Sequence, residues 1–236
     1  MSTPPALEIS GLNAWYGESH VLHGIDLTVH RGEVVCLLGR NGAGRTSTLR
    51  AILGLTSRTT GTVKVNGTDV TGKTTHEIAR LGIGYCPEER GIFASLSCEQ
   101  NLLLPPVVGS GQPLSLDEIY AMFPNLKERR NSPGGRLSGG EQQMLAIARI
   151  LRTGANLLLL DEITEGLAPV IVQKLGEVVR TLKARAFTVV LVEQNFRFAS
   201  QLADRNYVIE HGKVVLTVDK ENLTQNQKEL ETLLGV

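Results

Sequence analysis

Strand-like patterns occupy the first part of the chain. Apolar and polar residues alternate over 6–12 and 21–29, as in strands with one buried face, and we expect residues 13–19 to connect them. The run at 34–38 is apolar throughout, which is typical of a strand buried on both faces. This part of the chain is therefore expected to form strands around one buried strand.

Helical patterns replace strands in the middle of the chain. From about 89 to 135, prolines punctuate two short apolar-periodic runs that open with Ser97-x-x-Gln100 and Ser115-x-x-Glu118. This spacing is a capping box, in which two side chains satisfy N–H groups at the start of a helix. We therefore expect an inserted helical subdomain at about 89–135. A third box, Ser138-x-x-Glu141, predicts a helix over 138–152 with glycines at its start.

A strand, a helix and a second strand follow. The apolar run 157–160 ends in Asp161-Glu162, and a helix is expected from about 168 to 184. A second apolar run, 187–192, ends in Glu193-Gln194. This order is a βαβ unit, which brings the carboxyl ends of parallel strands to one edge of a sheet. The other strands expected are 62–65, 69–70, 81–86, 207–210 and 214–218, before a short terminal helix.

A glycine-rich turn follows the apolar run at 34–38. Its glycines let successive backbone N–H groups face one point, and the next helix adds its own N–H groups and positive dipole end. The spacing from Gly39 to Thr46 is that of a P-loop, G-x-x-x-x-G-K-[ST], with Arg45 in the lysine position. A dinucleotide fingerprint would need a third glycine where the chain has Ser47. The nucleotide-binding residues expected here are Gly39, Arg40, Asn41, Gly42, Ala43, Gly44, Arg45, Thr46 and Ser47.

Two carboxylates at the end of the 157–160 strand are candidates for metal binding and catalysis. Asp161 has the position of a carboxylate that holds Mg²⁺ through its water shell, and Thr46 offers a hydroxyl to the same ion. Glu162 is placed to polarise a water for in-line attack on a γ-phosphate. Acid pairs at strand ends are also common as helix caps. A phosphate loop on a neighbouring strand of the same sheet makes the catalytic interpretation the better one.

Composition narrows the class of protein. Lysine plus arginine and aspartate plus glutamate number 24 each, so we expect no nucleic-acid partner. Cys36, Cys86 and Cys98 lack metal-ligand spacing and are expected to be reduced thiols. Cys36 and Cys86 lie in strand-like apolar runs, so we expect them in the core. No apolar run approaches the ~20 residues that span a bilayer. If the protein works at a membrane, another chain must carry the membrane part.

The segment Leu137-Ser138-Gly139-Gly140, followed by Glu141, resembles the signature motif of the ATP-binding subunits of ABC transporters. The resemblance covers essentially the whole chain and implies an α/β P-loop NTPase of ABC type. Its nucleotide lobe would contain a mixed sheet, and one domain would span 1–236 with the helical subdomain inserted. Residues 141–149, 165–169 and 192–195 are similar to the branched-chain amino acid importer branch, and there to the smaller ATP-binding subunit.

The resemblance also implies roles for single residues. Tyr16 would stack on adenine. Glu162 would act as general base or orient the attacking water, and Gln194 would position the γ-phosphate or the water by hydrogen bonds. The Mg²⁺ ligands implied are Thr46, Asp161 and Glu88.

The family forms an assembly around ATP. The resemblance implies that two such subunits, identical or different, stack head to tail. The P-loop of one and the signature residues Leu137, Ser138, Gly139, Gly140 and Glu141 of the other then close on the same ATP. The helical subdomain would dock on membrane permease subunits, which serve a periplasmic solute-binding protein. The expected function is ATP hydrolysis that powers import of branched-chain or related amino acids from the cytoplasmic face of the membrane.

Four positions depart from the common pattern of the family. Glu88 stands where most members have glutamine, Gln194 where most have histidine, and Ile163 where proline is usual. Arg45 is the most consequential, because a guanidinium is broad and planar whereas the ammonium of lysine is compact. We expect Arg45 to keep nucleotide affinity but to slow hydrolysis, since misplacing a reacting group by about 1 Å can cost on the order of 10²-fold in rate.

Other functions stay open. A regulatory subunit that binds ATP but scarcely hydrolyses it is favoured by Arg45 and opposed by the intact Glu162. An importer ATPase for urea or short amides is also compatible, because solute selectivity lies in other chains. A soluble ABC protein of translation or DNA repair fits poorly, since such proteins usually carry two ATPase units or long insertions.

Overall fold

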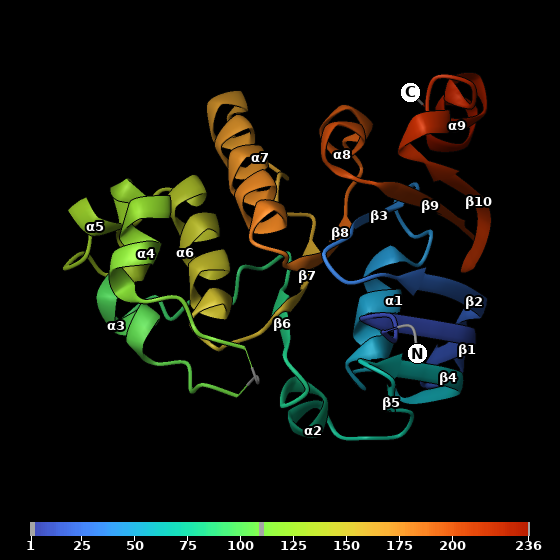
Figure 1. Cartoon of the computed structure of the whole chain (residues 1–236), viewed down its shortest axis with the longest axis horizontal. Helices are drawn as coiled ribbons and strands as arrows, with labels where there is room; N and C mark the ends of the chain where they lie inside the picture. Colours follow the sequence, from blue (N-terminus) through green and yellow to red (C-terminus); the bar gives the residue numbers. More distant parts are fainter. Residues whose placement is uncertain (1–2, 109–110, 236) are drawn as a thin grey trace.

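Two β-sheets lie next to each other, and a group of helices covers the far side of the larger one (Figure 1). The computed structural model describes residues 3–108 and 111–235. Residues 1–2 and 236, at the ends of the domain predicted over 1–236, lie outside the described residues. So do residues 109–110 of the predicted helical insertion.

The smaller sheet is antiparallel and has the strand order β2-β1-β4-β5. Its strands are β1 (Leu7–Tyr16), β2 (Ser19–Val29), β4 (Arg58–Val65) and β5 (Thr68–Asp69). The connection predicted over 13–19 is wrong, because β1 and β2 stay paired up to Tyr16 and Ser19. The rings of Trp15 and His20 stack across this pair with their centroids 4.2 Å apart. Polar residues at the partly exposed end of the pair hid the strand pattern.

The larger sheet has the order β10-β9-β3-β8-β7-β6. Its strands are β3 (Val34–Leu38), β6 (Ile83–Cys86), β7 (Leu157–Asp161), β8 (Thr188–Val192), β9 (Arg205–Glu210) and β10 (Lys213–Asp219). Only β10 pairs antiparallel, so the sheet is mixed as predicted. The phosphate loop was expected on a strand next to the one that ends in Asp161. This expectation is wrong, because β8 lies between β3, which precedes the loop, and β7, which ends in Asp161.

Capping boxes start three helices as predicted. Ser97, Ser115 and Ser138 each accept a bond from a backbone N–H three residues on, and the side chain there bonds back to the serine N–H. The helices are α1 (Arg45–Ile52), α2 (Thr75–Ala79), α3 (Cys98–Leu103), α4 (Leu116–Met122), α5 (Pro124–Glu128), α6 (Gly139–Leu151), α7 (Pro169–Ala184), α8 (Phe196–Leu202) and α9 (Gln227–Leu234). The short helices α2, α5 and α8 were not predicted individually, because so few apolar residues do not establish the 3.6-residue repeat of a helix.

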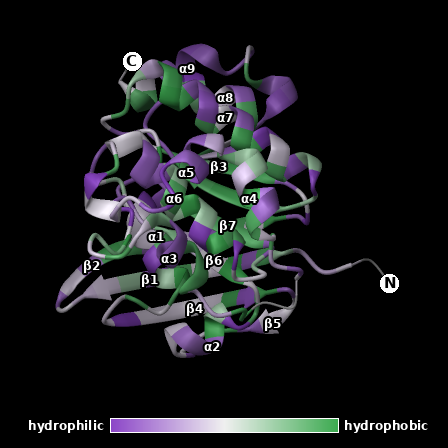
Figure 2. Cartoon of the chain, turned by 90° about the vertical axis from the view of Figure 1, so that its left-hand side faces the viewer, coloured by the Kyte–Doolittle hydropathy of each residue, from purple (hydrophilic) through white to green (hydrophobic). Residues whose placement is uncertain are grey.

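Alternate residues of the buried strands face two separate cores. Cys36 and Leu158 belong to a core shared with the helices α3–α7, whereas Val35 and Leu159 face α1 and the smaller sheet. Figure 2 shows hydrophobic residues along inner strands such as β7 and hydrophilic ones on the outer parts of the helices. Cys36, Cys86 and Cys98 are buried and free, as expected of reduced core thiols.

The parallel strands place three loops at one edge of the larger sheet. The glycine-rich turn follows β3, Glu162 follows β7, and Gln194 lies just beyond β8. The order of these strands therefore brings together segments far apart in sequence, which is the usual location of a ligand site in such sheets.

Candidate functional site

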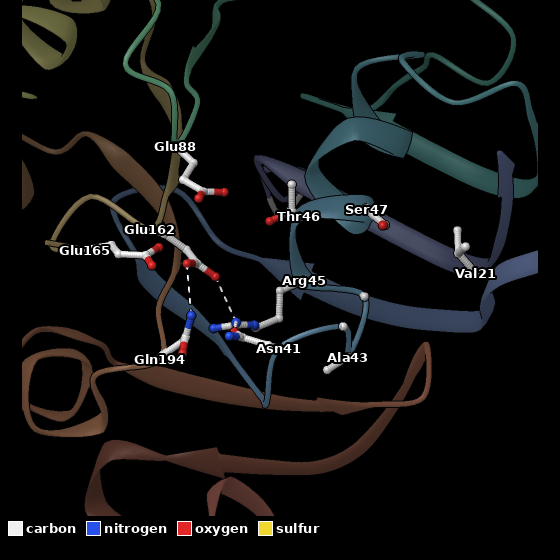
Figure 3. A pocket seen from close by; sticks show the side chains of 12 residues that line it. Val21, Asn41, Ala43, Arg45, Thr46, Ser47, Glu88, Glu162, Glu165 and Gln194 are labelled. Carbon is white, nitrogen blue, oxygen red and sulfur yellow. Dashed lines mark hydrogen bonds and ion pairs between the residues drawn. The ribbon is translucent and has the colours of Figure 1, made fainter.

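A cavity of about 450 Å³ opens at this edge of the sheet. Figure 3 shows the glycine-rich loop and the start of α1 on one side and three glutamates on the other. Residues that line the cavity are Val21, Asn41, Gly42, Ala43, Gly44, Arg45, Thr46, Ser47, Glu88, Glu162, Glu165 and Gln194. Most of the predicted nucleotide-binding loop therefore meets the predicted catalytic residues Glu162 and Gln194.

Glycine is required at two points of the loop. Gly39 has φ +155°, and a Cβ there would lie 2.3 Å from the backbone oxygen of Ile209 in β9. Gly44 is the N-cap of α1 with φ +111°, and a Cβ there would lie 2.9 Å from a methyl carbon of Leu22. No side chain caps α1 among the described residues, so its first N–H groups and positive dipole end remain available to an anion.

Arg45 pairs with the predicted catalytic glutamate. Its Nη2 lies 2.8 Å from Glu162 Oε1 and donates a hydrogen bond to Asn41 Oδ1 at 3.3 Å. Arg45 is buried and Glu162 is partly buried, with 4% and 10% of their side-chain surfaces exposed. The second terminal nitrogen of Arg45, Nη1, is buried and has no partner among the described residues. A buried cationic donor without an acceptor calls for an anionic ligand.

Two of the predicted Mg²⁺ ligands, Asp161 and Thr46, are in direct contact. The Thr46 hydroxyl donates to Asp161 Oδ1 at 2.9 Å, and the Tyr85 hydroxyl donates to Asp161 Oδ2 at 3.1 Å. Burial raises the pKa of the Asp161 carboxyl, and the two hydroxyl donors oppose that rise. A buried carboxylate beside a hydroxyl is an oxygen donor set that suits Mg²⁺.

The other oxygen of Glu162 has its own contact. Gln194 Nε2 donates to Glu162 Oε2 at 3.1 Å, so one carboxylate bridges the glycine-rich loop and the loop after β8. Glu162, Glu165 and Glu88 can bring one carboxylate oxygen each within 4.8 Å of the others. A hydrogen bond to Glu162 and burial raise the pKa of the Glu165 carboxyl. An incoming Mg²⁺ would relieve repulsion among these acids.

The signature residues lie away from this cavity. Gly139 and Gly140 begin α6, on the helical side of the molecule, with Ser138 as the N-cap (Figure 1). None of the described residues 137–141 lines the cavity. Arg90 lies beside the signature residues. Its guanidinium donates to Gln142 Oε1 at 2.8 Å, and a Cβ added at Gly139 would lie 3.4 Å from it.

Three predicted nucleotide-binding residues and the predicted metal ligand Asp161 lie outside the cavity lining. Arg40 lines a separate hollow between the loop and the C-terminal helix α9 together with Leu233. Gly39 lies beneath the loop against β9, and Tyr16 ends β1 without lining the cavity. The role of Tyr16 as an adenine platform stays a prediction.

Four residues of the site region were not singled out as site residues from sequence. Val21 and Glu165 line the cavity, and Tyr85 bonds Asp161. Glu193 is 2% exposed and carries a carboxylate bonded to Thr164. A signal existed for Glu165 and Glu193, because both lie in segments that resemble the importer branch.

The comparisons with known proteins match this geometry. The family model described as "ABC transporter" matches residues 22–165, which includes the glycine-rich loop, the signature residues, Asp161 and Glu162. The chain belongs to the ABC transporter family. That the signature of one copy meets the loop of another stays a prediction.

Curated ABC relatives match along nearly their whole length. The chain is 38% identical to the high-affinity branched-chain amino acid transport ATP-binding protein BraG of Pseudomonas aeruginosa, over 97% of this chain and 99% of the relative. It is 34% identical to LivF of Archaeoglobus fulgidus, a probable branched-chain amino acid transport ATP-binding protein, over 95% and 97%. These matches confirm the similarity to the branched-chain importer branch.

Solved ABC structures confirm the fold. A nucleotide-free ATP-binding cassette from an ABC transporter superposes with a TM-score of 0.83 at 21% identity, and covers 98% of this chain and 99% of that one.

None of the helices within residues 3–108 and 111–235 has the length and apolar character needed to cross a membrane.

Proposed function

We propose that this chain is the ATP-hydrolysing subunit of an importer for branched-chain or related amino acids. The observation that carries the proposal is the convergence of the glycine-rich loop and Glu162 on one cavity, with Asp161 hydrogen-bonded to Thr46 of its lining. The identity to BraG and LivF over nearly the whole chain supports the transport role. Nothing in the chain itself selects the solute, so urea and short amides are alternatives to amino acids.

ATP would lie with its phosphates on the loop and the first turn of α1. The backbone N–H groups and the dipole of α1 would bind the β-phosphate, and Arg45 Nη1 would gain the acceptor that it lacks. Thr46 and Asp161 would hold Mg²⁺, with Glu88 nearby, and the ion would neutralise charge on the phosphates. Tyr16 would close over the adenine.

Glu162 is the residue proposed to orient the attacking water. Its carboxylate would have to leave Arg45 and accept a proton or hydrogen bond from the water instead. Gln194 donates to the same carboxylate and stays uncharged, so it would hold Glu162 or the γ-phosphate by hydrogen bonds.

Assembly would complete the site. We propose a single domain in which the segment at about 89–135 is inserted and leads to the signature helix. A second ATP-binding subunit would supply its signature residues to this cavity, and the Ser138-capped end of α6 would serve the partner's ATP. Permease subunits would hold the chain at the cytoplasmic face of the membrane.

A regulatory subunit with little hydrolysis is the second candidate. The Arg45–Glu162 ion pair favours it, because it occupies one oxygen of the proposed base while Gln194 occupies the other. Closure on ATP without turnover would still move the permeases.

The deciding experiment uses the complete transporter in liposomes. We expect the reconstituted complex to hydrolyse ATP and import labelled leucine, and Glu162→Gln in this chain to abolish a substantial part of that ATPase activity. Unchanged ATPase activity in Glu162→Gln would show the second candidate to be correct. Import of urea or acetamide in place of leucine, isoleucine and valine would reassign the solute.

A further inference from the structure

A buried carboxylate lies behind the predicted catalytic pair. Glu193 directly follows β8 and is only 2% exposed. Its backbone N–H donates to the oxygen of Leu37 at 3.3 Å, which fixes it against β3. Burying an acidic side chain costs free energy of folding unless its oxygens are hydrogen-bonded. The partners of these oxygens therefore show what holds Glu193 in place.

Both oxygens of Glu193 are bound by one residue. The backbone N–H of Thr164 donates to Oε1 at 3.2 Å, and the Thr164 hydroxyl donates to Oε2 at 2.8 Å. Thr164 is itself 8% exposed. The Thr164 hydroxyl can accept as well as donate, so an amide at position 193 could keep both bonds, whereas an apolar side chain would lose both. The contact therefore needs a polar side chain at position 193 and a hydroxyl at position 164.

This contact joins the two loops that carry Glu162 and Gln194. Thr164 lies in the loop from β7 to α7, just after Glu162, and Glu193 is the residue before Gln194. The backbone N–H of Glu162 also donates a hydrogen bond to the backbone oxygen of Val192 at 2.9 Å, which joins the same two segments. The Gln194–Glu162 hydrogen bond thus depends on two loops that the Glu193–Thr164 contact holds together.

Charged and titratable groups surround Glu193 on three elements. Burial, and to a smaller extent Glu162 after β7, raise the pKa of its carboxyl to about 7, while the Thr164 donors and Arg45 of α1 oppose the rise. On β3, the buried Cys36 thiol faces the same carboxylate, and burial together with Glu193 raises the pKa of that thiol. The carboxylate is therefore held near the site at an electrostatic cost.

We propose that Glu193 is a positioning residue that clamps the Thr164 loop to the Gln194 loop and so aligns Glu162 for the chemical step. The clamp has no contact with the cavity, and it acts on the rate of hydrolysis instead of on nucleotide binding. The inference rests on the proposed ATPase function.

The test compares Glu193→Leu, Thr164→Val and the double variant in the reconstituted transporter, with Glu193→Gln as the conservative variant that can keep both bonds and should stay within about twofold of the wild-type kcat. We expect Glu193→Leu and Thr164→Val each to lower kcat about tenfold, since small misplacement of a catalytic group is costly, with the KM for ATP within about twofold. The double variant should be no slower than either single one, because both remove the same contact. Binding of a non-hydrolysable ATP analogue to the purified chain should change by less than about twofold.

Thr188→Val is the matched control. Thr188 is 4% exposed at the other end of β8, and its hydroxyl accepts a bond from the Gly32 N–H at 3.0 Å. We expect it to lower the thermal stability without changing kcat. Unchanged kcat in Glu193→Leu and Thr164→Val, additive losses, or an equal loss in Thr188→Val would overturn the clamp. A wild-type complex that hydrolyses no ATP would instead overturn the proposed function.

Discussion

Arg45 Nη2 lies 2.8 Å from Glu162 Oε1, and this ion pair joins the residue in the P-loop lysine position to the predicted catalytic base. Both partners are largely buried, so breaking the pair without an anionic replacement would leave a charge uncompensated. In the proposed binding mode the phosphates of ATP would supply the replacement, because they would give Arg45 a negative partner in place of Glu162. The pair would then link phosphate binding to release of the proposed base.

The first prediction concerns the shape of the cation. Arg45→Lys should raise ATP turnover of the assembled transporter by about tenfold, because the compact ammonium pairs less extensively with Glu162 and places the γ-phosphate better. Steady-state ATPase assays measure this. Arg205→Lys is the control, since Arg205 forms a similar ion pair with Glu33 at 2.8 Å and does not line the cavity. Equal rates for Arg45→Lys and the wild type would contradict the prediction.

The second prediction isolates the ion pair from hydrolysis. Glu162→Gln should tighten ADP binding to the purified chain by about tenfold, because Arg45 no longer has to leave a buried anion before it contacts the phosphates. In an Arg45→Ala background the same substitution should have little effect. Calorimetric titration of all four proteins measures the coupling. Equal gains in both backgrounds would mean that the two side chains act independently.

Sequence patterns predicted the local features of the site and missed its cross-connections. The capping boxes at Ser97 and Ser138 and the turn at Gly39 depend on neighbours within a few residues, so they can be read from spacing. The Arg45–Glu162 pair depends on strand order, in which β8 separates β3 from β7. The Glu193–Thr164 contact likewise depends on two loops meeting, and an isolated acidic residue after a strand gives no sign of its burial.

The third prediction separates helix capping from function. Ser138→Ala and Ser97→Ala each remove the serine of a capping box, and each should lower the free energy of unfolding by about 1 kcal/mol. Only Ser138→Ala should also lower the ATPase activity of the complex by more than about fivefold, because Ser138 is proposed to face the partner's ATP. Urea unfolding and ATPase assays provide the two measurements. Similar activity in both variants would remove Ser138 from the proposed dimer site.

The last prediction is a pH dependence. Burial raises the pKa of the Glu193 carboxyl to about 7 from a value of 4.5, so between these pH values the folded chain holds a proton that the unfolded chain has lost. The stability that this proton contributes is complete below about pH 4.5 and is lost as the pH rises through 7. Relative to Glu193→Gln, the wild type should therefore gain on the order of 1 kcal/mol or more between pH 7.5 and pH 5, since one pKa unit corresponds to about 1.4 kcal/mol. Asp161 and Glu165 titrate in both proteins, so the difference between them reports Glu193, and parallel urea-unfolding curves across this range would show that its carboxyl titrates normally.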